Sequence, residues 1–233
     1  MITKKYNRYK PLYKKFISLR KNISYNQKIL NFNKKKWQKI IFFLRRSDKT
    51  KNKIYKIFDL NLYFISKFGT IFKKQHKYNL QTKQKINLFY GGLKKKYLKK
   101  LLFLNLEKNK TKSLMYGLEN RLDTIIYRSH FSSSLRTSRQ LIAHGHILVN
   151  KQKVKNSSYK VQPGDNIEVS PNIKFLIKFN IGNSSLWPLP PKNLSINYKT
   201  LKIVYTQNIN NVNLSQYFPF WADWNTLVQY YKK

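Results

Sequence analysis

Residues 121–154 read RLDTIIYRSHFSSSLRTSRQLIAHGHILVNKQKV, and this stretch decides the fold of the middle of the chain. Leu122, Ile125 and Ile126 repeat at helical spacing. They predict a short helix that ends near residues 129–131. The serines that follow are favourable N-cap residues, so the chain is expected to begin a second helix directly afterwards.

The second helix is defined by its apolar side and by its end. Leu135, Leu141 and Ile142 supply the apolar side. Gly145 stands where a helix is expected to end in the left-handed conformation, which glycine adopts without steric cost. A chain reversal is therefore expected at this glycine.

Short strands are predicted after that reversal. Residues 147–149 are Ile-Leu-Val, a polar turn follows at 150–152, and Val154 resumes the apolar pattern, as in a β-hairpin. Pro-Gly-Asp at 163–165 is typical of a turn, and residues 166–169 alternate as in a half-buried strand. Two helices, a hairpin and a third strand thus form a compact α/β unit of about 55 residues.

Charge divides the chain unevenly. The sequence holds 48 Lys plus Arg against 8 Asp plus Glu, a formal net charge of +40 over 233 residues. Residues 1–110 carry +29 of this charge, residues 111–170 carry +5 and residues 171–233 carry +6. A compact state with so much unbalanced charge repels itself, so a polyanionic partner is expected. Nucleic acid is the leading candidate, and an anionic membrane surface is the second.

Helical stripes and aromatic residues flank the central unit. Trp37, Ile40, Ile41 and Leu44 predict one helix, Ile54, Ile57 and Phe58 a weaker one, and Leu93, Tyr97, Leu101 and Leu104 a lysine-rich third. Leu201, Ile203 and Tyr205 alternate as in a strand, and the aromatic terminus from Tyr217 to Tyr231 is expected to dock on the protein. The predicted class is α+β. It comprises a basic, mainly helical region at 1–112, the module at 113–170, and a C-terminal extension at 171–233 that packs back on the helical part.

Composition excludes several classes of protein and indicates a source. The chain has no cysteine and only four scattered histidines, so no disulfide framework, thiolate nucleophile, metal site or cofactor is expected. Its longest compact apolar run, residues 40–44, is far too short for a membrane span. Lys outnumbers Arg 40 to 8, a bias that AT-rich codon drift explains better than selection for phosphate binding. Such drift suggests an organellar gene or a very AT-rich bacterium, and no secretion signal is expected.

The segments 121–131, 135–154 and 161–169 together resemble the RNA-binding module of the small-subunit ribosomal protein four family. They share its Arg-Leu-Asp, Tyr-Arg, Arg-x-x-x-Arg-Gln-Leu, His-Gly-His-Ile-x-Val-Asn and Pro-Gly-Asp elements. QTKQKINLFYGGLKKKYLKKLL at 81–102 and NTLVQYYKK at 225–233 are similar to the family's flanking segments, most of all in its mitochondrially encoded members. Plastid members are the less similar alternative.

The resemblance implies a structural constituent of the mitochondrial small ribosomal subunit. Such a protein binds small-subunit rRNA at a multi-helix junction, contacts neighbouring ribosomal proteins and supports early assembly. It lies near the channel through which mRNA enters, where it influences decoding fidelity. Other proteins use the same module, so a ribosome-associated RNA-modifying or rescue factor is the alternative. An enzyme is not expected, because Asp48, Asp59 and Asp165 lack the setting of a catalytic carboxylate.

Candidate RNA-binding residues follow from side-chain chemistry and from the resemblance. Half of the arginines lie in the module, where a planar fork can grip phosphate or stack on bases, although solvated arginine on a helix face is the alternative. For Arg121 with Asp123, an internal ion pair or an N-cap that shapes the first helix is the favoured interpretation. Lys151 replaces the glycine usual in the family's hairpin turn, which leaves the turn type open. The full set is Arg121, Arg128, Arg136, Arg139, Gln140, His144, His146, Asn150, Lys151, Lys153, Lys85, Lys94 and Lys95.

Overall fold

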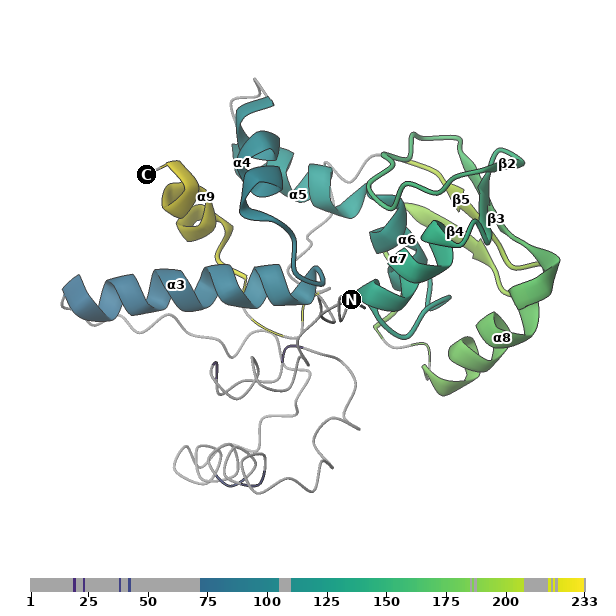
Figure 1. Cartoon of the computed structure of the whole chain (residues 1–233), viewed down its shortest axis with the longest axis horizontal. Coiled ribbons are helices and arrows are strands. Elements are labelled where there is room, and N and C mark those ends of the chain that lie inside the picture. The colour runs from purple at the N-terminus through teal and green to yellow at the C-terminus, as the bar shows by residue number, and fades with distance from the viewer. Residues whose placement is uncertain are drawn as a thin grey trace, which may run out of the picture. The chain divides into compact units, whose positions relative to one another are not determined.

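The computed structural model describes residues 72–104, 110–184, 186, 188–207, 218, 220 and 222–232, together with Leu19, Ile23, Gln38 and Phe42. These residues belong to two compact units, each of which is described by itself (Figure 1). The first unit comprises residues 1–89 and 218–223, and the second comprises residues 90–217 and 224–233. The helices predicted around residues 37–44 and 54–58 lie outside the described residues, apart from the isolated positions 38 and 42.

The first unit contains the long helix α3 (Phe72–Phe89). The ring of Phe89, the last residue of this helix, contacts two aromatic rings from the C-terminal segment. Its centroid lies 4.9 Å from that of Phe218 and 5.9 Å from that of Phe220. Phe218 and Phe220 are both buried, so the prediction that the aromatic C-terminal extension packs back on the helical part is confirmed.

Three helices of the second unit pack together: α4 (Lys95–Leu104), α5 (Lys110–Glu119) and α9 (Trp224–Lys232). Gly117 of α5 permits the close approach of α4, because a Cβ at this position would lie only 3.0 Å from the side chain of Leu101. The buried stripe of α4 comprises Leu98, Leu101 and Leu102. The predicted stripe was wrong at Leu93, which precedes the helix, and at Tyr97, which is only half-buried.

Helices α6 (Leu122–Arg128) and α7 (Leu135–Ala143) confirm the two helices predicted in the central stretch. The Ser134 side chain caps α7 by accepting a hydrogen bond from the Thr137 N–H at 3.2 Å. At the other end Gly145 is left-handed, with φ of 74°. Its N–H donates to the Ile142 carbonyl, and the His146 N–H donates to the Leu141 carbonyl. These two bonds form a Schellman motif, which reverses the chain into the sheet.

One antiparallel sheet follows, with the strand order β2-β1-β3-β5-β4. Its strands are β1 (Ile147–Val149), β2 (Gln152–Lys153), β3 (Asn166–Val169), β4 (Leu194–Asn197) and β5 (Lys202–Tyr205). Ile147 lies opposite Val169, and Ile167 lies opposite Ile203. This register places the alternating apolar residues of the central strands on one buried face.

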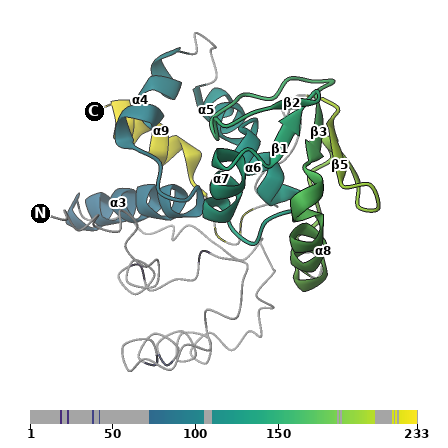
Figure 2. The ribbon, with the colours of Figure 1, turned by 45° about the vertical axis from the view of Figure 1, so that its right-hand side comes forward.

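The hydrophobic core formed with the sheet lies between its buried face and the helices α6, α7 and α8 (Lys174–Asn183) (Figure 2). Ile126 of α6, Ile142 of α7 and Ile177 are fully buried in it. Ile177 belongs to α8, a helix that follows the short 3₁₀ turn η3 (Pro171–Ile173) and that the sequence did not lead us to expect. Because β3 pairs with β5, the domain boundary expected at residue 170 falls inside the sheet.

The β1–β2 hairpin has a two-residue turn made by Asn150 and Lys151. Both have positive φ, 50° and 67° respectively, which is the pattern of a type I′ turn. The type I′ turn, which Asn-Gly favours, therefore forms here with a lysine at its second position. Lys151 pays a conformational cost at this position, because its Cβ is strained in the left-handed region.

Replacing Lys151 with glycine should relieve that strain. We expect Lys151→Gly to raise the free energy of unfolding by about 0.5–1 kcal/mol, which is the left-handed strain less the extra chain entropy of glycine. Lys153→Gly, in the neighbouring strand, is the matched control and should lower stability by a similar amount. Urea unfolding of the full chain measures both, and a destabilised Lys151→Gly variant would contradict the assigned turn.

His130 lies in the connection between α6 and α7, where it is buried and left-handed, with φ of 64°. Its Nε2 is 2.7 Å from the carbonyl oxygen of Pro188, so the neutral ring donates a hydrogen bond there. Burial, helped by the nearby positive charge of Arg128, lowers the pKa of His130. The folded chain therefore holds this ring in its neutral form.

This lowered pKa predicts that acid destabilises the fold. The unfolded chain takes up a proton at His130 near the ordinary pKa of about 6.5, and the folded chain takes it up only at lower pH. The contribution of His130 to stability is complete above pH 6.5 and is lost as the pH falls toward the folded pKa. His130→Asn, which tolerates the same backbone conformation, should reduce the loss of stability between pH 7.5 and 5 in thermal unfolding. An unchanged pH dependence would contradict this assignment.

Candidate nucleic-acid interface

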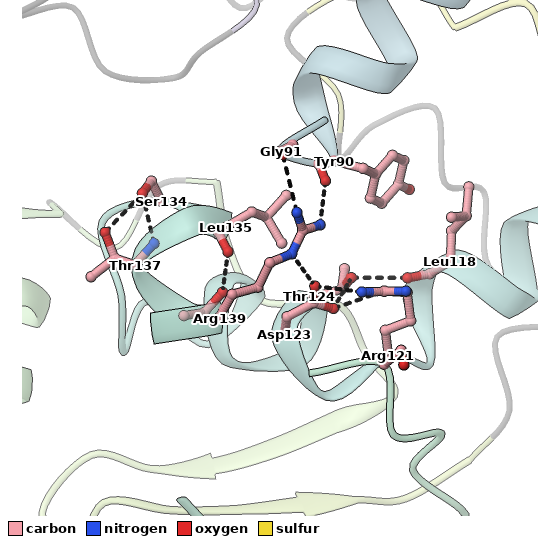
Figure 3. Close-up of polar contacts among 12 residues, drawn as sticks. Tyr90, Gly91, Leu118, Arg121, Asp123, Thr124, Ser134, Leu135, Thr137 and Arg139 are labelled. Atoms are coloured by element: carbon pink, nitrogen blue, oxygen red, sulfur yellow. Dashed lines mark hydrogen bonds and ion pairs between the residues drawn. The ribbon is translucent and has the colours of Figure 1, made fainter. Parts of the chain in front are cut away.

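The carboxylate of Asp123 is completely buried at the start of α6 and is held by two arginines (Figure 3). Arg121 donates from Nε to Oδ1 at 2.9 Å and from Nη2 to Oδ2 at 2.8 Å. Arg139 of α7 donates from Nε to Oδ2 at 2.7 Å. One carboxylate thereby fixes the relative position of the two module helices.

The same arginines reach the segment that precedes α4. Arg139 donates to the main-chain carbonyl of Gly91 at 3.0 Å and also to that of Tyr90 (Figure 3). The guanidinium carbon of Arg121 lies 4.9 Å from the centre of the Tyr97 ring, a cation–π distance. The Asp123 site therefore joins α6, α7 and residues 90–97 within the second unit.

A second buried ion pair involves Arg128 and Glu119. Arg128 donates to Glu119 Oε2 at 3.1 Å and to Oε1 at 2.8 Å, and the Tyr90 hydroxyl also donates to Oε1. Burial and the Glu119 carboxylate raise the pKa of Tyr90 well above its ordinary value. This pair links the end of α6 to the end of α5.

These contacts engage three of the module's arginines within the chain, and RNA binding by the arginines stays a prediction. Arg121 is 3% exposed and Arg128 is 5% exposed, because their forks are engaged by buried carboxylates. Arg139 is used in the same way at Asp123. For Arg121 the alternative of an internal ion pair is confirmed. Arg136 is half-buried on α7.

The corner between α7 and β1 exposes the predicted polar residues. Gln140 and His144 are exposed and His146 is half-buried. The two imidazole rings lie nearly parallel, with centroids 6.0 Å apart and an interplanar angle of 24°. His146 Nδ1 is 3.4 Å from the Ser170 hydroxyl, and the main-chain N–H of Ser170 donates to the His146 carbonyl. The Schellman motif thus presents two stacked rings beside the end of β3.

The β1–β2 hairpin presents lysines to solvent. Lys151 and Lys153 are exposed as predicted, and so are Lys155 and Lys160, which the prediction omitted although they continue the same lysine series. Asn150 has a structural role, because its amide donates to Asp165 Oδ1 at 2.8 Å and accepts from the Asn166 N–H at 3.0 Å.

The predicted RNA-binding lysines outside the module differ in their exposure to solvent. Lys94 and Lys95 are exposed at the start of α4, as predicted. Lys85 of α3 is only 8% exposed, so most of its side chain is covered within the chain. A helical stripe of lysines does not by itself reveal which of them is covered in the folded chain.

The positions of the acidic residues explain why the surface around the exposed lysines is positively charged. Each of the five carboxylates in the described residues is engaged within the chain. Asp165 accepts from the Gln162 N–H, Asp223 accepts from the Tyr78 hydroxyl, and Glu168 pairs with Lys202. The hydrogen bond from Lys202 lowers the pKa of Glu168. Within the described ranges no carboxylate pairs with the exposed lysines 94, 95, 151, 153, 155 and 160.

The chain is similar in sequence to known proteins. Residues 120–167 match the S4 domain model. The chain is 34% identical to small ribosomal subunit protein uS4m of Marchantia polymorpha over 161 residues, which are 66% of this chain and 80% of that protein. The chain belongs to the uS4 family.

Two other relatives are similar to part of the chain. The chain is 35% identical to uS4m of Reclinomonas americana over 170 residues, 65% of this chain and 64% of that protein. It is 45% identical to uS4 of Aquifex aeolicus over 118 residues, 48% of this chain and 56% of that protein. The chain thus spans about half to two thirds of the length of several uS4 relatives that it matches.

Removing the Asp123 carboxylate should destabilise the uS4 module. We expect Asp123→Asn to lower the free energy of unfolding by about 3–5 kcal/mol, because two largely buried guanidinium groups lose their counter-charge. Glu168→Gln, at a solvent-exposed pair, is the matched control and should leave the unfolding midpoint nearly unchanged. Denaturant unfolding of the full chain measures both. Equal effects of the two variants would show that Asp123 does not join the helices.

Proposed function

We propose that this uS4-family chain is a structural constituent of the mitochondrial small ribosomal subunit that binds small-subunit rRNA. The observation that carries the proposal is the division of charge. The described carboxylates are engaged inside the chain, and the exposed lysines of the hairpin and of the start of α4 pair with no carboxylate among the described residues. A surface of this kind gains affinity for phosphate by releasing counterions.

We infer that the RNA surface comprises the helix corner and the β1–β2 hairpin. Lys151 and Lys153 are placed to contact phosphates, and Gln140, His144 and His146 can hydrogen-bond or stack on unpaired bases. Lys94 and Lys95 add a second cationic site at the start of α4. The proposed target is a multi-helix junction of the rRNA, which the protein reads through its shape and phosphates.

The resemblance supports the finer parts of this proposal. Relatives named uS4m occur in Marchantia polymorpha and Reclinomonas americana, which supports a mitochondrial ribosome as the location. Neighbouring small-subunit proteins and mRNA near the channel through which it enters are the further proposed partners. The proposed role is in early assembly and decoding fidelity, with no catalytic activity. Among the described residues, no helix has the length and apolar character needed to cross a membrane.

Neutralising the hairpin should weaken RNA binding in a salt-dependent way. We expect Lys151→Ala with Lys153→Ala to reduce the log–log salt slope for a small-subunit rRNA junction fragment by roughly 2, since each lost phosphate contact removes about 0.9. Filter binding with the full chain at several salt concentrations measures the slope.

Lys192→Ala with Lys199→Ala is the control for this variant, since it removes the same charge from exposed sites next to β4. It should change the slope much less. Equal losses in the two double variants would contradict the assigned surface. The unsubstituted chain should also stay with small subunits during sedimentation in high salt, whereas a loosely associated factor would dissociate.

A further inference from the structure

Helix α8 is apolar on two of its sides, and the part of the chain that the structure describes packs against only one of them. Ile177 is fully buried in the core, and Ile173 and Ile181, four residues to either side, pack against the same core. These three residues form the inward stripe that packs η3 and α8 against the core. An ordinary surface helix would be polar over the rest of its circumference.

The outward side of α8 is also apolar. Phe175 is 84% exposed, Leu176 is 43% exposed and Phe179 is 61% exposed. We call these three residues the outer strip. Figures 1 and 2 show α8 at the margin of the second unit, beyond the end of β3. A contiguous exposed apolar strip on a soluble domain marks a surface that another molecule covers.

The charged residues of η3 and α8 are all positive. Lys174 and Lys178 are exposed one turn apart on α8, and neither η3 nor α8 contains an acidic residue. A molecule that buries the strip therefore gains by bringing negative charge to its margin. Long lysine side chains at such a margin also add apolar stem contacts.

We propose that the outer strip docks a segment of another protein that carries an apolar face bordered by carboxylates. A second copy of this chain does not fit, because it is itself strongly positive and its described carboxylates are already engaged. Unpaired RNA uses flat aromatic faces and nearby cations. Here an aliphatic side chain, Leu176, belongs to the strip, and the spacing of its three residues is that by which a helix packs into an apolar partner.

This inference rests on the proposed function, since it places the partner in the small ribosomal subunit. The test reconstitutes the full chain into purified small subunits with a photo-crosslinking residue, Phe175→p-benzoylphenylalanine. We expect a crosslink that protease removes and ribonuclease does not, to a peptide with apolar residues next to Asp or Glu. The same substitution at exposed Lys199 is the positional control and should not give this crosslink.

Two double variants then separate a protein partner from RNA. Phe175→Ser with Phe179→Ser should reduce retention of the crosslinked protein about tenfold or more, as expected for loss of two central apolar contacts. Phe175→Leu with Phe179→Leu keeps the apolar area but removes the flat rings, so it should retain the partner to within about twofold. Both variants change only exposed side chains, so the chain itself should still enter the particle.

Each contrary result has a distinct meaning. A crosslink to RNA, or loss of binding in the leucine variant, would replace protein docking with base stacking and overturn the proposal. Incorporation of the chain with no crosslink above the Lys199 control would show an open strip and also overturn it. Failure of the unsubstituted chain to enter small subunits would instead reject the proposed function, and the docking proposal would fall with it.

Discussion

The buried carboxylate of Asp123 is the constraint on which the second unit depends. Burying a carboxylate away from water is costly unless it is paired, and Asp123 is paired with two arginines. Both arginines reach it only when α6 and α7 lie side by side. Because Arg139 also bonds to the Tyr90 and Gly91 carbonyls, the same arrangement holds the turn before α4. The pair of Arg128 with Glu119 repeats this logic at the other end of α6. Electrostatics thus specifies how these elements meet, and the apolar core supplies most of the driving force.

Because the carboxylates are used inside the protein, few remain to balance the lysines on its surface. The chain has eight acidic residues, and the five that the structure describes serve ion pairs, turns or hydrogen bonds within the protein. The lysines around the hairpin and at the start of α4 are left with no carboxylate partner among the described residues. The architecture that builds the uS4 module therefore also leaves its exterior cationic. This connection between packing and charge underlies the proposed binding of rRNA.

Much of the module could be predicted from local pattern. Some signals act within one or two helical turns and can be recognised in the sequence: the spacing of Leu122, Ile125 and Ile126, the Ser134 cap, and Gly145. Helix α8 and strand β4 were missed. The apolar residues of α8 are spread around its circumference, so no single stripe stands out, and β4 depends on pairing with β5, eight residues further along. The ion pairs of Arg128 and Arg139 could not be predicted, because an arginine that binds RNA and an arginine that pairs with a buried carboxylate look alike in sequence.

The amino-acid sequence by itself determined the net charge of +40, the helix–helix–hairpin order of the central stretch and the family to which it belongs. These properties are additive over residues or local in the chain. Only the tertiary structure decided which cations face solvent. Arg128 and Glu119 lie on different helices, and Arg139 is 48 residues from Gly91. Whether a guanidinium meets a carboxylate, a carbonyl or water therefore depends on how the helices pack. The sequence thus predicts an RNA-binding protein, and the packing of its helices selects the residues left to make the contacts.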